Sequence, residues 1–336
     1  MFLVRKRAFA RAGLVGNPSD GYHGRTISIV VRDFWAEVVL YEWDSVDIVL
    51  AEDDRASFHS VQDLARDVRL HGYYGGIRLV KATIKRFVEY CDKRGVALHG
   101  RNFSVRYETT IPRQVGLAGS SAIIVATLRC LMEFYGVEVP LVAQPSFVLS
   151  VERDELGIAA GLQDRVIQVY EGLVSMDFAR EREKDVDGFQ CYAYEPMDPG
   201  LLPPLFLAWS DQLSEPTEVF HNDIRGRFDR EETGVVQAMK TFGRLAAEAR
   251  TALREGDVVR LAALMNENFD TRRRIYALPA WQVEMVETAR RCGASAKFAG
   301  SGGAIIGTFR GAAMFEELSA RLGALGCRTL RPRVAE

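Results

Sequence analysis

The stretch IPRQVGLAGSSAIIVATLRCLMEFYG, residues 111–136, joins a loop of glycine, alanine and serine directly to an apolar run with helical periodicity. The first amides of a helix lack intrahelical partners, and the helix dipole adds partial positive charge there. Glycines beside such a helix end let an anion approach, because no Cβ stands in the way. The stretch therefore predicts a phosphate-binding loop ahead of a buried helix that ends at Gly136. A serine that only caps the helix after a tight loop explains the pattern equally well.

The better-known nucleotide and hydrolase motifs do not account for this loop. A Walker A loop requires Gly-Lys followed by Ser or Thr, and no lysine of this chain follows a glycine. The loop also fails the GxGxxG fingerprint, and the chain has neither a GxSxG nor an HExxH motif. Any anion bound here would be held by the amides and hydroxyls of the loop itself.

The overall composition argues against nucleic-acid and membrane partners. The 336 residues include 43 basic and 45 acidic ones, a net charge of −2, so no strong field attracts polyanions. The apolar runs fall short of the ~18 residues of a membrane span, and the basic N-terminus does not resemble a secretory signal. The five cysteines form no CxxC pair, which indicates buried thiols in a reducing cytoplasm.

Two further loops of small residues lie near the ends of the chain. One is ARAGLVGNPSDGYHGRTIS, residues 10–28, and the other is KFAGSGGAIIGTF, residues 297–309. Small-residue loops at the start, middle and end are typical of a ligand site at a domain interface. Prolines gather in EPMDPGLLPP, residues 195–204, so we expect one domain over residues 1–197 and a second over 198–336.

Between these loops, strand-like and helix-like patterns alternate. The charged runs DREE and RRR (229–232 and 272–274) indicate solvent-exposed helix faces. The predicted strands are residues 27–32, 35–43, 47–52, 103–111, 172–178, 189–194, 205–209, 294–300, 301–309 and 327–334. The predicted helices are residues 60–70, 73–95, 122–136, 147–156, 217–229, 233–255, 257–274, a stretch after Pro279, and 314–323.

Together the three loops resemble the motifs of the GHMP kinase superfamily, in the same order. The central family motif, Pro-x3-Gly-Leu-Gly-Ser-Ser-Ala, corresponds here to PRQVGLAGSSA, with Ala118 as one extra residue. ARAGLVGNPSD is similar to the first motif of galactokinases, and the third loop matches in place and composition. The resemblance implies an α+β fold, with a ribosomal protein S5 domain 2-like, ATP-binding N-terminal domain and a ferredoxin-like C-terminal domain.

Within the superfamily, four segments are most similar to glucuronokinases. They are residues 13–28, 72–79, 111–123 and 157–178. This resemblance implies transfer of the γ-phosphate of ATP, with Mg²⁺, to the anomeric hydroxyl of D-glucuronate. A kinase for a galactose-like sugar or a heptose phosphate is the alternative, as is a non-catalytic sensor of sugar and ATP. The galactokinase-like first loop disfavours a non-sugar kinase of the homoserine or mevalonate type.

The resemblance also assigns roles to residues of this sequence. Asp164 would orient or deprotonate the acceptor hydroxyl, with Arg11 as its partner cation, and Ser121 and Glu152 would bind the metal. The residues implied in nucleotide binding are Pro112, Gly116, Leu117, Ala118, Gly119, Ser120 and Ser121. The residues implied in substrate binding are Asn17, Asp20, Lys297, Gly300, Ser301, Gly302 and Gly303.

Each of these residues also has an ordinary structural explanation. Asp164 is also a suitable cap for a helix, and Arg11 and Glu152 suit an exposed strand or helix surface. Asn17 and Asp20 belong to Asn-Pro-Ser-Asp-Gly, which is a strong turn signal. The glycines of the third loop are equally typical of a β-turn.

A uronate substrate also requires a cation for its carboxylate, and arginine suits such a contact because it donates two parallel hydrogen bonds. Arg25 and Arg113 lie near the predicted loops. Either of them would serve the nucleotide equally well, so the sequence leaves the carboxylate-binding residue open.

Overall fold

The computed structural model describes residues 2–49, 75–210 and 218–335. Its longest feature is an antiparallel pair of strands, β1 (Leu3–Val15) and β2 (Arg25–Trp43), whose register shifts after Phe9 and after Gly13. The sequence predicted no strand before residue 27. It also predicted two separate strands, 27–32 and 35–43, which was wrong, because β2 continues through residues 33–34 and pairs with β1 on both sides of the register shift.

The first sheet has six strands in the order β3-β4-β2-β5-β8, with β1 paired to β2. A separate ribbon consists of β6 and β7. The predicted strand over 189–194 was wrong as a single element, because its two ends belong to β7 and β8. Only the first part of the predicted strand over residues 47–52 lies within the described residues. The bounds are β3 (Asp47–Ile48), β4 (Asn102–Thr109), β5 (Leu173–Asp177), β6 (Lys184–Val186), β7 (Phe189–Cys191) and β8 (Ala193–Met197).

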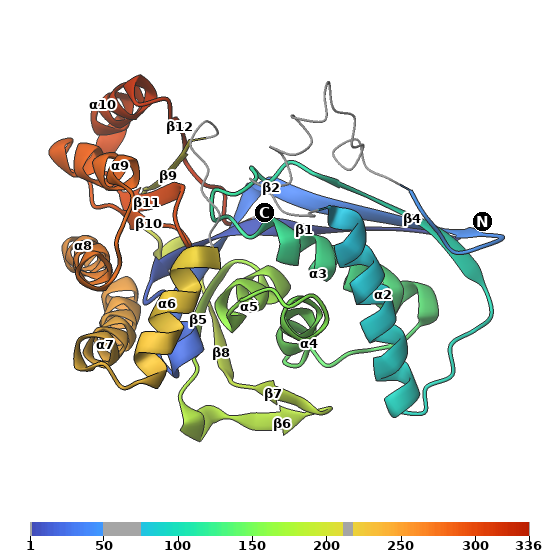
Figure 1. Ribbon diagram of the computed structural model, residues 1–336. Coiled ribbons are helices and arrows are strands. Elements are labelled where there is room, and N and C mark those ends of the chain that lie inside the picture. Colours follow the sequence, from blue (N-terminus) through green and yellow to red (C-terminus); the bar gives the residue numbers. More distant parts are fainter. Residues whose placement is uncertain (1, 50–74, 211–217, 336) are drawn as a thin grey trace, which may run out of the picture.

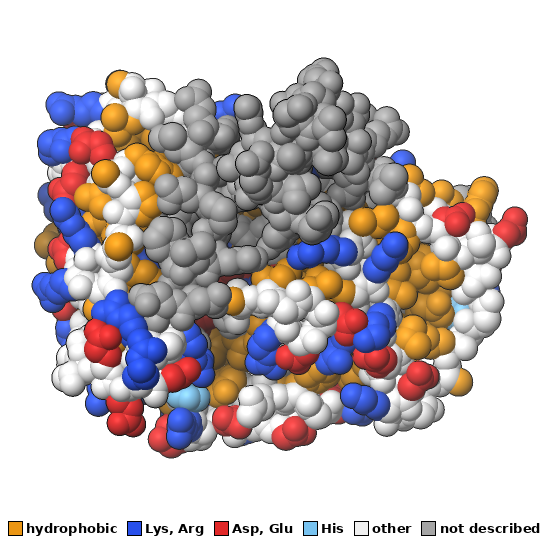
Figure 2. All heavy atoms as spheres, in the orientation of Figure 1, with side chains coloured by type: hydrophobic (Ala, Val, Ile, Leu, Met, Phe, Trp, Pro, Cys, Tyr) orange, Lys and Arg blue, Asp and Glu red, His pale blue; other side chains and the backbone are white. Residues whose placement is uncertain are grey.

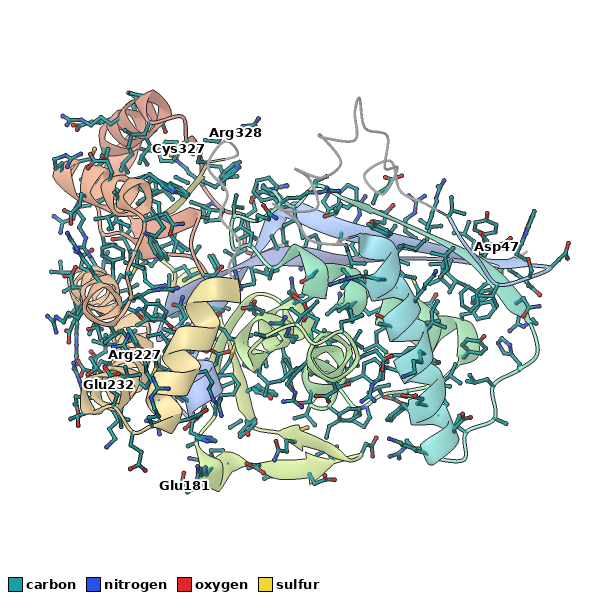
Figure 3. The ribbon with its side chains drawn as sticks, viewed as in Figure 1. Asp47, Glu181, Arg227, Glu232, Cys327 and Arg328 are labelled. Atoms are coloured by element: carbon teal, nitrogen blue, oxygen red, sulfur yellow. The ribbon has the colours of Figure 1, made fainter. Side chains whose placement is uncertain are left out.

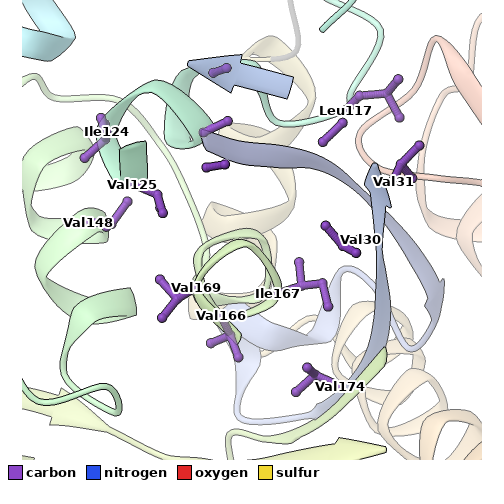
Figure 4. Close-up of a cluster of buried hydrophobic side chains, with 14 of the residues drawn as sticks. Val30, Val31, Leu117, Ile124, Val125, Val148, Val166, Ile167, Val169 and Val174 are labelled. Atoms are coloured by element: carbon purple, nitrogen blue, oxygen red, sulfur yellow. The ribbon is translucent and has the colours of Figure 1, made fainter. Parts of the chain in front are cut away.

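Helices cover one side of this sheet (Figure 1). They are α2 (Gly76–Lys93), α3 (Gly119–Tyr135), α4 (Gln144–Ser150) and α5 (Leu162–Tyr170). The apolar helix α3 is buried as predicted, and it contacts both β1 and β2. Figure 4 shows valines and isoleucines of α3, α4, α5 and β2 meeting in one core, among them Val125, Val148 and Ile167. This core fixes the start of α3, and therefore the glycine-serine loop, against the sheet.

A single helix over residues 147–156 was predicted, and this was wrong. The helix α4 ends at Ser150 and is followed by a wider π-helical turn, η3 (Val151–Glu155). The wider turn directs Glu152 into the protein, where its side chain is completely buried. The predicted helix over residues 60–70 lies outside the described residues.

The second sheet is antiparallel, in the order β10-β11-β9-β12. Numbered along the chain, its strands lie in the order 2-3-1-4, which is the ferredoxin-like arrangement expected for this half. The strands are β9 (Leu205–Trp209), β10 (Lys297–Phe298), β11 (Ala304–Thr308) and β12 (Arg328–Leu330). The helices are α6 (Glu218–Asp229), α7 (Thr233–Glu255), α8 (Val258–Ile275), α9 (Ala280–Arg291) and α10 (Gly311–Ala324).

The two halves share their largest hydrophobic core. Residues of β9 and α7, such as Leu207 and Leu245, belong to the same buried cluster as β1, β2 and α3. The division at residues 197 and 198 therefore stays a prediction. Arg227 and Glu232, labelled in Figure 3, pair at 2.6 Å and connect α6 to the start of α7.

Lys, Arg, Asp and Glu side chains are interspersed over the visible described face (Figure 2). Among the described helices, none has the length and apolar character that crossing a membrane requires. All five cysteines are buried free thiols, as predicted.

Candidate active site

The predicted nucleotide loop, from Pro112 to Ala118, enters α3 with an unusual backbone. Gly116 has a φ of +72° and Ala118 a φ of +62°, both in the left-handed region, which glycine adopts freely and alanine only at a cost. Leu117 is buried between them and anchors the loop. The first two residues of α3, Gly119 and Ser120, remain partly exposed. Their amides are therefore accessible to an anion.

Arg11 of β1 and Asp164 of α5 form a two-pronged ion pair beside this loop. Arg11 donates from Nε to Oδ1 at 2.5 Å and from Nη2 to Oδ2 at 2.7 Å. Its third nitrogen, Nη1, donates to the carbonyl of Gly116, and its backbone amide donates to the carbonyl of Leu117 at 3.3 Å. Arg11 is 5% exposed, so it is not the exposed strand arginine of the alternative reading. The pair fixes the carboxylate of Asp164 next to the predicted nucleotide loop.

Glu152 lies against the start of α3, but its neighbour differs from the one expected. Ser120 donates to Glu152 Oε1 at 2.7 Å, whereas Ser121 is completely buried and its hydroxyl contacts the carbonyl of Ala118 at 3.3 Å. Successive helix residues point about 100° apart, so only one of the two serines faces Glu152. Arg165 donates to Oε2 from Nε at 2.6 Å and also from Nη2. Ser120, rather than Ser121, is therefore the hydrogen-bond partner of Glu152, and the role of Ser121 as a metal ligand stays a prediction.

These groups fit a magnesium ion shared with a nucleotide. Among the described residues, no cluster of three or more His, Cys, Asp and Glu side chains forms a closed metal site. Magnesium in kinases commonly takes one or two carboxylates and completes its shell with phosphates and water. Glu152 Oε1 and the Ser120 hydroxyl, at the N-terminal end of α3, are oxygen donors of that kind.

Asn17 and Asp20 lie in the loop that follows β1, close to the start of α5. Asp20 accepts a hydrogen bond from the backbone amide of Gln163 at 3.2 Å, and Asn17 Oδ1 accepts one from Lys297 at 2.6 Å. Burial and then the negative charge of Asp164 raise the pKa of Asp20 to about 6. Asp20 and Asp164 are therefore close enough to interact.

Lys297, predicted to contact substrate, has its three ammonium hydrogens engaged within the protein. It donates to the carbonyls of Gly13 and Phe298, each at 2.7 Å, and to Asn17 Oδ1. It is 1% exposed, and burial, together with the charge of Arg272, lowers its pKa well below the usual value. The structure thus gives Lys297 the position of a clamp between β10 and the first loop.

The third predicted loop packs directly on the second. A Cβ on Gly300 would collide with the carbonyl of Gly116 and lie 2.9 Å from Arg11 Nη1. Gly303 has a φ of +81°, which an L side chain would strain. The loop consists of Gly300, Ser301, Gly302 and Gly303. The glycines of the two loops therefore allow a close approach that no other residue permits.

Comparison with known proteins finds the same family that the three loops resemble. The model of the GHMP kinases N terminal domain matches residues 78–172, and that of the GHMP kinases C terminal domain matches residues 249–326. Glucuronokinase 1 of Arabidopsis thaliana is 47% identical over 311 residues, which cover 90% of this chain and 84% of that protein. The chain belongs to the GHMP kinase family.

A second relative and a solved structure agree with this family and with its fold. Probable glucuronokinase 2 of Arabidopsis thaliana is 45% identical over 307 residues, covering 89% of this chain and 82% of that protein. The structure of Lactococcus lactis galactokinase complexed with galactose matches with a TM-score of 0.79 at 14% identity, over 99% of this chain and 93% of that one. At that identity the structural likeness shows the fold alone.

Three polar residues of this GHMP kinase's site were not anticipated from the sequence. Arg165 neutralises Glu152, and Asn268 of α8 holds the first loop by accepting from the amide of Gly16 at 2.6 Å. The run from Arg272 to Arg274 was predicted to be exposed, which was wrong for Arg272: it is buried, and only the other two arginines are exposed. Arg272 lies four residues after Asn268, so both are on the same face of the helix. This spacing is the one sequence signal that could have indicated that Arg272 is buried.

We expect the pH dependence of this GHMP kinase to reflect Asp20. Because its pKa is raised to about 6, lowering the pH through that value protonates the carboxylate and removes its capacity to accept two hydroxyl hydrogen bonds. kcat/KM for the sugar should therefore fall as the pH drops through 6. The profile of Asp20→Asn, which cannot titrate there, should lack this inflection. An unchanged inflection in that variant would assign the titration to another group.

Removing the Asn268 side chain should weaken both the fold and the sugar site. Asn268→Ala leaves the buried amide of Gly16 and the carbonyl of Asn17 without their partner, which costs about 2 kcal/mol of unfolding free energy. KM for the sugar should rise, because Asn17 loses its support. Asn266→Ala, whose side chain accepts from the Ala296 amide at 3.0 Å, is the matched control for stability. Wild-type sugar KM in Asn268→Ala would contradict the assignment.

Proposed function

We propose that this GHMP kinase phosphorylates the anomeric hydroxyl of D-glucuronate at the expense of ATP. The observation that carries the proposal is the ion pair of Arg11 and Asp164, held directly against the anion-binding loop. The similarity to Glucuronokinase 1 over 90% of the chain supports glucuronate as the acceptor. The product would be glucuronate 1-phosphate, with ADP and a proton.

Phosphoryl transfer depends mainly on positioning and on neutralising charge. ATP supplies the phosphoryl group, and Mg²⁺ neutralises the phosphate oxygens when both are bound. The amides of residues 116–121 are suited to hold phosphate oxygens at the N-terminal end of α3, where the helix dipole favours negative charge. Ser120 and Glu152 are suited to bind the metal.

Asp164 is the group suited to receive the acceptor's proton. Its two oxygens are oriented by Arg11, which leaves the carboxylate in a fixed position. A carboxylate within hydrogen-bond reach of the hydroxyl aligns its lone pair for attack and accepts its proton as the new P–O bond forms. Arg11 then also places a positive charge near the transferred group.

The first loop is suited to recognise the sugar ring. Asp20 can accept from two hydroxyl groups, and Asn17 lies beside it. For the uronate carboxylate, Arg25 and Arg113 remain the candidates. Arg25 donates to Asp177 at 2.9 Å and is half-exposed, so engaging a substrate would require it to exchange that partner.

A substrate screen tests the proposal. ADP release is measured with purified protein, ATP and Mg²⁺ against uronic acids, neutral hexoses and heptose phosphates, and the product is identified by phosphorus NMR. We expect the highest kcat/KM with glucuronate and phosphorylation at C1. Turnover only with a neutral sugar or a heptose phosphate would overturn the glucuronate assignment. Tight binding of sugar and ATP with no product would instead indicate a sensor.

The compartment proposed for this reaction is the cytoplasm. Five buried thiols, none of them in a disulfide, are compatible with a reducing environment. The partners proposed are the sugar and ATP, with no nucleic acid or membrane, which the near-neutral net charge of −2 supports.

A further inference from the structure

Arg272 is an arginine in an unusual environment. It lies near the end of α8, is 3% exposed, and forms no ion pair with any described carboxylate. Burial lowers its pKa. Its guanidinium lies over the rings of Tyr276 and Phe298, 5.0 and 5.2 Å from their centroids. A buried cation without a carboxylate partner is costly, so its hydrogen bonds indicate what it does.

Those hydrogen bonds go to the third glycine loop. Nη1 of Arg272 donates to the carbonyl of Gly300 and Nη2 donates to the carbonyl of Ser301, both at 2.8 Å. One planar guanidinium thus holds two consecutive carbonyls on the same side of the loop. Lysine, which has a single nitrogen, would not reproduce this two-pronged contact.

The planar trans peptide then fixes the amides. In such a unit the C=O and N–H bonds point in opposite directions, so a carbonyl directed at Arg272 turns the next amide away from it. The amides of Ser301 and Gly302 therefore point away from Arg272. The nitrogen of Ser301 lies on the side of Gly116, 3.2 Å from the position that a Cβ on Gly116 would take.

We propose that Arg272 is a positioning residue that turns the amides of Ser301 and Gly302 away from itself and holds that of Ser301 beside Gly116, where it donates to the transferring phosphoryl group. The proposal rests on the kinase function proposed above. It assigns to Arg272 no contact with substrate. Arg272 acts through the loop, and its positive charge favours an anion on the loop's other face.

The matched control is Arg290, another arginine of the same half. It lies over the ring of Phe269, 5.2 Å from its centroid, and donates to the carbonyls of Asn266 and Ala296 at 2.9 and 3.3 Å. These contacts resemble those of Arg272 and do not involve the third loop, although Arg290 also pairs with Asp270 at 2.7 Å. Removing Arg290 therefore reproduces the loss of packing without disturbing residues 300–303.

The test compares Arg272→Ala, Arg272→Lys and Arg290→Ala by kcat, by KM and by thermal unfolding. We expect Arg272→Ala to lower kcat about 100-fold with little change in the sugar KM. Millimolar guanidinium should restore part of that kcat, and Arg272→Lys should remain impaired. Arg290→Ala should lose stability while keeping wild-type kcat. Wild-type kcat in a folded Arg272→Ala, or an equal kcat loss in Arg290→Ala, would overturn the proposal.

Amide hydrogen exchange provides a readout that does not depend on catalysis. Without Arg272, the amides of Ser301 and Gly302 should exchange faster than in the wild type, whereas Arg290→Ala should leave them unchanged. Unchanged exchange in Arg272→Ala would refute the positioning role. If the wild type phosphorylates no sugar while Arg272→Ala still speeds exchange, the proposed function fails and the control of the loop by Arg272 stands.

Discussion

Asp164→Asn should reduce kcat about 10³-fold while leaving KM for the sugar nearly unchanged. The amide has nearly the same shape as the carboxylate, but it is a far weaker proton acceptor and presents only one oxygen to Arg11. The two-pronged contact, 2.5 and 2.7 Å in the wild type, is therefore lost. Steady-state kinetics with saturating ATP measures the effect, and thermal unfolding shows whether the variant remains folded.

The control is a second aspartate that accepts two hydrogen bonds from one arginine. Asp33 accepts from the backbone amide of Arg333 at 2.8 Å and from its Nε at 3.1 Å, in an exposed position. Asp33→Asn should keep wild-type kcat, because exposed ion pairs contribute little. Near-full turnover in Asp164→Asn, or a comparable loss in Asp33→Asn, would refute the assigned role.

Gly116→Ala should lower kcat/KM for ATP by about 100-fold. The new Cβ would lie 2.6 Å from the carbonyl of Gly302, closer than atoms tolerate, so the two loops would have to separate. A displacement of about 1 Å in a positioning element commonly costs that much in rate. Kinetics at varied ATP and direct titration with an ATP analogue distinguish weaker binding from slower transfer.

Gly136→Ala isolates the backbone strain from this collision. Gly136 ends the same helix α3 with a φ of +65°, similar to the +72° of Gly116, but a Cβ there meets no atom within 4 Å. The variant should lose about 1–2 kcal/mol of unfolding free energy and keep wild-type kcat/KM. If the two variants were equally active, close packing of the loops would not matter for nucleotide binding.

Local patterns predicted the helices of the second half well. Regular apolar spacing gave α7 over residues 233–255, and the alternating stretch from residue 103 gave β4. The strand β1 was missed because its inner positions are small, with Ala8, Ala10 and Ala12 fully buried. Alanine carries little strand preference, and only tertiary contact with α3 and β2 reveals why small residues stand there.

The sequence motifs identified the three loops, Arg11 and Asp164, but not the side chains that support them. Arg11, Asp164 and the three loops meet, although they are distant in the chain. The side chains that support them, Arg165 and Arg272, could not be identified. Their spacing resembles that of any helical arginine, and only the folded chain shows which carboxylate or carbonyl each one meets. The choice between Ser120 and Ser121 likewise depends on how α3 is rotated.

A crystal structure with glucuronate and a non-hydrolysable ATP analogue tests the central claim most directly. We predict phosphate oxygens within hydrogen-bond distance of the amides at residues 116–121, and the anomeric hydroxyl within hydrogen-bond distance of the carboxylate of Asp164. Phosphates bound elsewhere while this loop stays empty, or a sugar whose anomeric hydroxyl points away from Asp164, would contradict the account.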